Sequence, residues 1–195
     1  MIDSNLNVEQ VKKAIARDVL NLLATCDEYN CLMGEESENV EILNKAATKF
    51  FAVYQMVIWG DLVISLSRIT GPKATRRGKQ NIDNLTIQLL PDLVDPIFKS
   101  EVLEKVNIAI EKSNFVLVAR NKIFAHRDLA VALSPNAEGI RRGNLHEMRE
   151  AVWAVVEAVE SAIPNTVKWH SIKRPGGAND LVKLLKFALE KKDQQ

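Results

Sequence analysis

The chain has 195 residues, of which 47% are hydrophobic and 26% are charged, and its formal net charge is +1. This composition is typical of a globular protein and predicts a single domain over residues 1–195. A net charge so close to zero argues against a protein that coats nucleic acid, although it is compatible with a local basic patch.

Three features of the sequence predict a soluble, cytoplasmic protein that does not associate with membranes. Cys26 and Cys31 lie five positions apart with no second pair, which argues against a disulfide framework or a zinc site and favours reduced thiols. The N-terminal segment lacks the apolar run of a signal peptide. Charged residues are expected to interrupt every apolar stretch before the roughly 18 residues that a membrane span needs.

Two long helices are predicted in the first third of the chain. Apolar residues recurring at steps of three and four predict an amphipathic helix over residues 8–33 that ends at Gly34. A second helix is expected over residues 40–69, and Gly71 and Pro72 end it. Because its middle part, from Phe50 onwards, is apolar on most sides, we expect it to lie in the centre of a bundle or at a subunit contact.

The next segment is strongly basic and is predicted to be a loop. Four cations fall within seven residues: Lys73, Arg76, Arg77 and Lys79. They favour contacts with the phosphates of a nucleic acid, while the alternative is a solvated loop without a binding role. Both interpretations stay open on the sequence alone.

A short helix and a third long helix are predicted after the basic segment. Asn81 or Asp83 is expected to cap a short helix through Leu90. The long helix is expected to run from about residue 98 or 101 to Ala125, because apolar residues keep helical spacing there. Its predicted apolar face consists of Leu103, Val106, Ile110, Leu117 and Phe124.

The last third of the chain is predicted to hold two more helices. Residues 129–143 read as irregular, after which Asn144 is expected to cap a helix with an apolar stripe from Leu145 to Ile163. The final helix is expected to begin at Asn179 or Asp180. Its predicted inward residues are Leu181, Leu184, Leu185 and Ala188. The sum is an all-α protein, an antiparallel bundle of four long helices with one or two additional short helices.

Groups that can perform chemistry concentrate near the expected end of the third long helix. They are Arg120, Asn121, Lys122, His126, Arg127 and Asp128. On one straight helix Arg120 and His126 would lie about 120° apart and about 9 Å along the axis, so they would not converge on one atom. Two copies related by a two-fold axis would bring the same residues from each subunit together.

This set of side chains suits the cleavage of a phosphodiester bond in RNA. The 2′-hydroxyl of RNA is an internal nucleophile, His126 is able to transfer protons, and Arg120 is able to stabilise the charge that builds on the phosphate. Asn121 would orient the phosphate or a water molecule. No metal and no cofactor are expected, because none of the three histidines has a ligand-spaced partner. The alternative is structural, since cations at a helix C-terminus also stabilise the last carbonyls.

The segment from Arg120 to His126 resembles the Arg-x5-His signature of the HEPN superfamily, and its extension to Asp128 is similar to the abortive-infection branch. Residues 64–69 also resemble a helix of that branch. The resemblance implies a helical bundle, a homodimer, and a metal-independent endoribonuclease of a toxin–antitoxin or defence system. It implies that Arg120 and His126 are the catalytic pair and that Asn121 supports them. One HEPN group carries a regulatory Tyr two residues after the His, whereas this chain has Asp128.

Two functions follow as expectations. The first is a HEPN-type endoribonuclease that acts on RNA as a homodimer and is regulated by an antitoxin or another protein. In this function the phosphates are contacted by Lys122, by Arg127 and by the four cations Lys73, Arg76, Arg77 and Lys79. The alternative is a non-catalytic helical module that binds a nucleotide, RNA or a protein partner.

Overall fold

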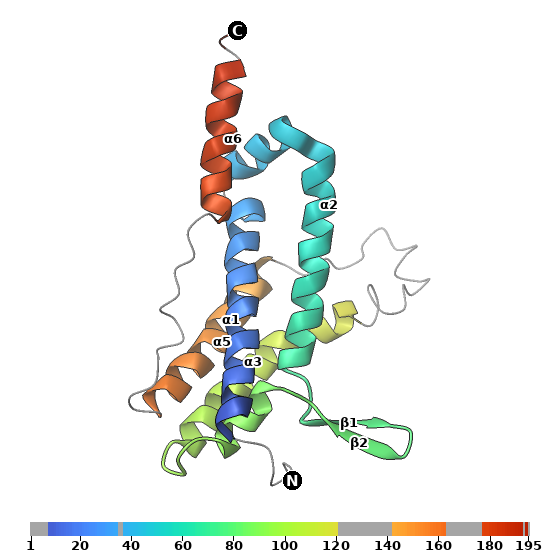
Figure 1. Ribbon diagram of the computed structural model, residues 1–195, viewed down its shortest axis with the longest axis vertical. Coiled ribbons are helices and arrows are strands. Elements are labelled where there is room, and N and C mark those ends of the chain that lie inside the picture. The colour runs from blue at the N-terminus through green and yellow to red at the C-terminus, as the bar shows by residue number, and fades with distance from the viewer. Residues whose placement is uncertain (1–7, 35–36, 121–141, 163–176, 193, 195) are drawn as a thin grey trace. The chain divides into compact units, whose positions relative to one another are not determined.

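The structure is a computed structural model that describes residues 8–34, 37–120, 142–162, 177–192 and 194 (Figure 1). Within these residues it has five α-helices, one 3-10 helix and one two-stranded sheet, so the prediction of an all-α protein is confirmed. The chain divides into two compact units. The first unit comprises residues 1–23 and 63–171, and the second comprises residues 24–62 and 172–195. The assignment of one domain stays a prediction.

The two N-terminal helices form where the apolar spacing predicts them, and each contributes residues to both units. Helix α1 spans Val8–Met33, and helix α2 spans Ser37–Ile69 and so begins three residues earlier than predicted. Ala47 interrupts the helical backbone of α2, with φ −163° and ψ 70°. Nothing in the sequence indicates this kink, because alanine has the highest helix propensity of all residues.

In the second unit, α2 is buried on one side and exposes apolar residues on the other. Phe51 is 7% exposed and Ile58 is 8% exposed. The exposed residues are Phe50 at 63%, Val53 at 57%, Met56 at 64% and Val57 at 61%. This part of α2 is therefore not buried on all sides, which leaves the predicted alternative of a subunit contact.

The apolar content of α2 also bears on the expectation that charge interrupts every apolar stretch early. Asp61 is the only charged residue between Lys49 and Arg68. By length and composition alone, residues 38–69 meet the criteria for a membrane-spanning helix, with a mean hydropathy of 1.5 in the most apolar window. Asp61 does interrupt the uncharged run that begins at Phe50, so the expectation holds for that run, although the helix as a whole meets these criteria. Core helices of soluble proteins meet the same criteria, so the finding assigns no location.

Helix α6, Ala178–Lys192, is held in the second unit by its first turn and by an ion pair between Lys186 and Glu38 of α2. The backbone N–H of Ala178 donates to Oε2 of Glu28 at 2.5 Å, so a side chain of α1 caps the helix in place of the predicted Asn179 or Asp180. The predicted inward face is wrong, because Leu181 is 39% exposed and Leu184 is 67% exposed. The buried side is instead formed near the capped end, at Ala178 and Val182.

The core of the first unit includes the packing of α3, Lys99–Ala119, against α5, Arg142–Ser161. The predicted stripe of α5 is confirmed in the described residues, which are Leu145, Met148, Val152, Val155 and Val159, all buried. Ile163 lies outside them. The predicted cap at Asn144 is wrong, because α5 already begins at Arg142.

The buried face of α3 lies about one residue before the face that was predicted to be buried. Leu103 is 44% exposed and Leu117 is 37% exposed. The buried residues are Val102, Val106, Ala109, Ser113 and Val116. The true stripe contains a serine, whose hydroxyl donates to the carbonyl of Ala109 at 2.6 Å and so becomes compatible with burial.

The basic segment is a β-hairpin and not a loop, and the helix predicted from residue 81 or 83 does not form. Strand β1, Ala74–Arg77, pairs antiparallel with β2, Gln80–Asp83. A two-residue turn joins them, and Gly78 has φ 61°, a conformation that such turns require and that glycine adopts at no steric cost. A 3-10 helix, η1, follows at Ile87–Asp92 and is capped by Thr86.

Candidate functional site

The predicted catalytic stretch begins where helix α3 ends. Arg120 occupies the C-cap with φ −55° and ψ −50°, so its backbone is still helical. Its N–H donates to the carbonyls of Leu117 and Val116. The residue is half-buried. A cation at this position is favoured by the partial negative charge of a helix C-terminus.

Arg120 is the one predicted catalytic residue that the structure describes. Asn121, Lys122, His126 and Arg127 lie outside the described residues, as does the predicted continuation of the helix to residue 125. The convergence of this set on one phosphate therefore stays a prediction.

The start of α5 lies beside α3 about two turns before Arg120. Nζ of Lys112 and Oε2 of Glu147 are 2.7 Å apart, and both side chains are exposed. The hydrogen bond from Lys112 is the main cause that lowers the pKa of the Glu147 carboxyl, and the same bond raises the pKa of Lys112. This pair is therefore charged at neutral pH. His146 lies next to it and is also exposed.

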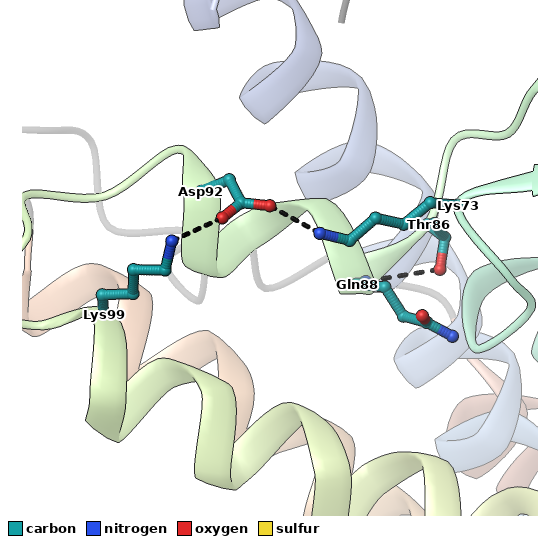
Figure 2. A network of polar contacts seen from close by, with 5 residues as sticks. All are labelled: Lys73, Thr86, Gln88, Asp92 and Lys99. Atoms are coloured by element: carbon teal, nitrogen blue, oxygen red, sulfur yellow. Dashed lines mark hydrogen bonds and ion pairs between the residues drawn. The ribbon is translucent and has the colours of Figure 1, made fainter. Parts of the chain in front are cut away.

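The four cations of the basic segment separate into two groups. Lys73 lies at the base of the hairpin, where Nζ is 2.5 Å from Oδ2 of Asp92 (Figure 2). Oδ1 of the same carboxylate is 2.8 Å from Nζ of Lys99, the first residue of α3. Lys73 thus has a structural partner, which weakens its assignment as a phosphate contact.

Arg76, Arg77 and Lys79 lie at the far end of the hairpin and are all exposed. Nε of Arg76 donates to the carbonyl of Gly78 at 3.2 Å. No carboxylate of the described residues forms an ion pair with any of these three cations. The structure brings them together at one tip.

The base of the hairpin is fixed to the end of α2 by two side chains that sequence reasoning missed. The hydroxyl of Thr86 lies 2.7 Å from the carbonyl oxygen of Ile69 and 2.8 Å from that of Gly71. Nε2 of Gln88 donates to the carbonyls of Thr70, at 3.1 Å, and of Gly71, at 2.9 Å. These carbonyls end a helix and need donors. The sequence marked only where the helix stops, and nothing in it indicated that residues 86 and 88 would supply the donors.

Asn84, which follows β2, binds the backbone and a side chain at the start of β1 and so holds the base of the hairpin together. Its Nδ2 lies 2.8 Å from the carbonyl oxygen of Pro72 and 2.6 Å from Oγ1 of Thr75, and its backbone N–H donates to the carbonyl of Lys73 at 2.8 Å. The hairpin is therefore anchored at its base although its strands are exposed throughout.

Among the described residues, no three His, Cys, Asp or Glu side chains gather as a set that would hold a metal ion. Cys26 is buried and Cys31 is half-buried, and both are thiols.

Comparison with known proteins bears on the resemblance carried by Arg120 to His126. No curated protein and no solved structure matches the chain. A family model, HEPN AbiU2, matches residues 8–181, which is most of the chain and includes the whole motif. The resemblance to the abortive-infection branch of the HEPN superfamily is thereby confirmed. The chain belongs to the HEPN AbiU2 family.

Proposed function

We propose that this protein is a metal-independent endoribonuclease of the HEPN type, with Arg120, Asn121 and His126 as its catalytic residues. The observation that carries the proposal is the family match over residues 8–181, which includes these three residues. The half-buried guanidinium of Arg120 supports it, because this group binds phosphate oxygens bidentately.

In the proposed reaction the 2′-hydroxyl of one nucleotide attacks the adjacent phosphorus. His126 takes the proton of that hydroxyl, the bond from phosphorus to the 5′-oxygen breaks, and the leaving oxygen gains a proton. The products are a 2′,3′-cyclic phosphate and a 5′-hydroxyl. Arg120 stabilises the charge on the phosphate oxygens, Asn121 orients the phosphate, and Lys122 and Arg127 contact neighbouring phosphates.

We propose further that two copies form the active unit. The exposed row on α2, which consists of Phe50, Val53, Met56 and Val57, supports this. Burying an apolar side chain of this size contributes roughly 1.5–3 kcal/mol. Four such side chains from each copy give a gain comparable with the roughly 4–15 kcal/mol that association costs. An isologous interface that includes the end of α3 would bring an Arg120 and a His126 from each subunit to one site.

We propose that the protein is a toxin or defence component of the cytoplasm, controlled by an antitoxin or another regulatory protein. The match to an abortive-infection family supports the defence role. Production of the wild-type chain in bacterial cells is then expected to arrest growth, and production of His126→Ala is not. Equal arrest by both chains would contradict this role.

The proposed function is tested by incubating the purified chain with RNA in the presence of EDTA. Wild type is expected to cleave, and Arg120→Ala and His126→Ala are each expected to lose at least about 100-fold in rate, the contribution of general acid–base or electrostatic catalysis. His146→Ala is the matched control, since it removes an exposed histidine of α5, and its rate should equal that of wild type. Full activity in both site variants, or a strict need for magnesium, would contradict the proposal. RNA binding without cleavage by wild type would favour the non-catalytic module.

A further inference from the structure

The tip of the β1–β2 hairpin presents positive charge on both faces of a narrow ribbon. Arg76 and Arg77 are successive residues of a strand, so their side chains point to opposite faces. Lys79 lies in the turn between the strands. Figure 1 shows the ribbon extending away from α3 and α5 of the same unit.

The residues opposite the two arginines are amides and not carboxylates. The register places Arg76 opposite Asn81 and Arg77 opposite Gln80. Opposite charges at such positions stabilise a hairpin, so acidic residues would be favoured if the arginines served only the stability of the ribbon. The amides instead leave both guanidinium groups unneutralised and add further hydrogen-bond donors beside them. Asp83, the one carboxylate of the strands, lies opposite Ala74 at the other end.

The base of the hairpin has the opposite character, because several polar side chains there bind one another or the backbone. Thr86 and Gln88 bind carbonyls at and just beyond the end of α2, and Asn84 binds groups on both sides of β1. Asp92 pairs with Lys73 and Lys99, as Figure 2 shows. The cations at the base are therefore paired with a carboxylate, whereas those at the tip have no such partner among the described residues. An anchored ribbon also loses less conformational entropy on binding than a flexible loop would.

We propose that the β1–β2 hairpin is an arm that binds the phosphate backbone of RNA through Arg76, Arg77 and Lys79. The inference deepens the proposed function, since it rests on RNA as the substrate and assigns the arm to holding it, whereas catalysis belongs to the C-terminal end of α3. Guanidinium groups bind phosphate oxygens bidentately, and the contact is independent of base sequence.

A polyanionic partner of another kind, an acidic protein, fits the hairpin less well. Protein interfaces are built around buried aromatic and apolar residues. Ile82, at 41% exposure, is the only large apolar side chain of the two strands. The ribbon therefore offers charge and hydrogen-bond donors but almost no surface for an apolar contact.

The test measures binding of a short fluorescent single-stranded RNA whose 2′-hydroxyls are methylated, so that cleavage cannot occur. The variant replaces Arg76, Arg77 and Lys79 by Gln. Neutralising three phosphate contacts is expected to reduce the slope of log affinity against log salt by about 2, and to weaken binding at least about tenfold at low salt. Lys45→Gln, Lys49→Gln and Lys192→Gln together form the matched control, because they remove the same charge from exposed positions of the second unit. This control is expected to bind nearly as wild type does.

The outcomes distinguish a failure of the proposed RNA-binding arm from a failure of the proposed nuclease activity. Unchanged affinity and salt slope in the tip variant would overturn the arm, even if the wild-type chain cleaves RNA. Loss of binding in the tip variant would support the arm, even if no cleavage is found. A DNA strand of the same sequence should compete, because its backbone carries the same phosphates. If polyglutamate displaces the probe at equal charge concentration, the tip binds any polyanion and the assignment to nucleic acid is overturned.

Discussion

Asp92 joins three segments of the first unit through one carboxylate. The hydrogen bond from Lys73 and then that from Lys99 lower the pKa of Asp92 below its ordinary value of 3.8. The side chains of this cluster are 40% to 53% exposed, so water screens the attraction. The contribution to stability is therefore modest and belongs to the ordinary range of surface ion pairs.

Replacing Asp92 by Asn is expected to lower the free energy of unfolding by up to about 1 kcal/mol at pH 7. The folded-state pKa is the lowered one, so this stabilisation is complete above the unfolded value near 4 and disappears as the pH falls through the folded pKa. Urea denaturation at several pH values should show the difference between wild type and variant shrinking under acid. A difference that grows under acid would contradict the account. Asp83→Asn, an exposed carboxylate with no ion pair to the described residues, is the control.

At the scale of elements, the end of α2 depends on Thr86. The hydroxyl is buried, at 1% exposure, and replacing it by an apolar group leaves carbonyls of Ile69 and Gly71 without this donor. Thr86→Val is therefore expected to destabilise the protein by about 1–3 kcal/mol, the cost of an unsatisfied buried polar group.

The control for Thr86 is Thr48→Val. Thr48 also donates to a carbonyl, that of Asn44 at 2.6 Å, but it is exposed, so water replaces the lost bond. Its variant is expected to change stability by no more than about 0.5 kcal/mol. Equal effects of the two substitutions in urea or thermal denaturation would show that Thr86 does not fix the end of α2.

The sequence predicted well those helices in which a regular stripe of apolar residues is enough to tell which side is buried. Helices α1 and α5 follow this rule, and their bounds lie close to the expected ones. The face of α3 was misjudged because Ala109 and Ser113 line the buried side, and neither residue carries a strong apolar signal. The exposed row of α2 was not predictable either, since periodicity does not tell which apolar residues find a neighbour.

The hairpin was missed for a different reason. Its strands have four residues each, are exposed on every side, and lack the alternation of apolar and polar residues by which strands are recognised. Gly78 was the one available signal of a tight turn. The sequence suggested the candidate site through the chemistry of its residues, and that assignment stays a prediction. The sequence did not reveal that Lys73 is paired within the fold while Arg76, Arg77 and Lys79 are gathered at the tip.

At the scale of the whole molecule, the proposal of a two-copy active unit makes a prediction about α2. Val57→Glu, placed in the middle of the exposed apolar row, would bury a charge in the proposed interface and should convert a dimer into a monomer in analytical ultracentrifugation. Because the site is proposed to combine residues of both copies, the variant should also lose at least about 10-fold in cleavage rate. Asn44→Glu, at an exposed polar position of the same helix, should leave both properties unchanged. A monomeric variant that cleaves RNA at the wild-type rate would contradict the two-copy unit.

The proposed reaction is attack of the 2′-hydroxyl of RNA without a metal ion, and it leaves products that can be identified chemically. An oligonucleotide with RNA linkages and its analogue with a single 2′-deoxy residue at the cleaved position are incubated with the wild-type chain in EDTA. We expect the RNA to yield a 2′,3′-cyclic phosphate and a 5′-hydroxyl, and the substituted position to resist cleavage. Cleavage at the 2′-deoxy position, or products with a 3′-hydroxyl and a 5′-phosphate, would contradict it.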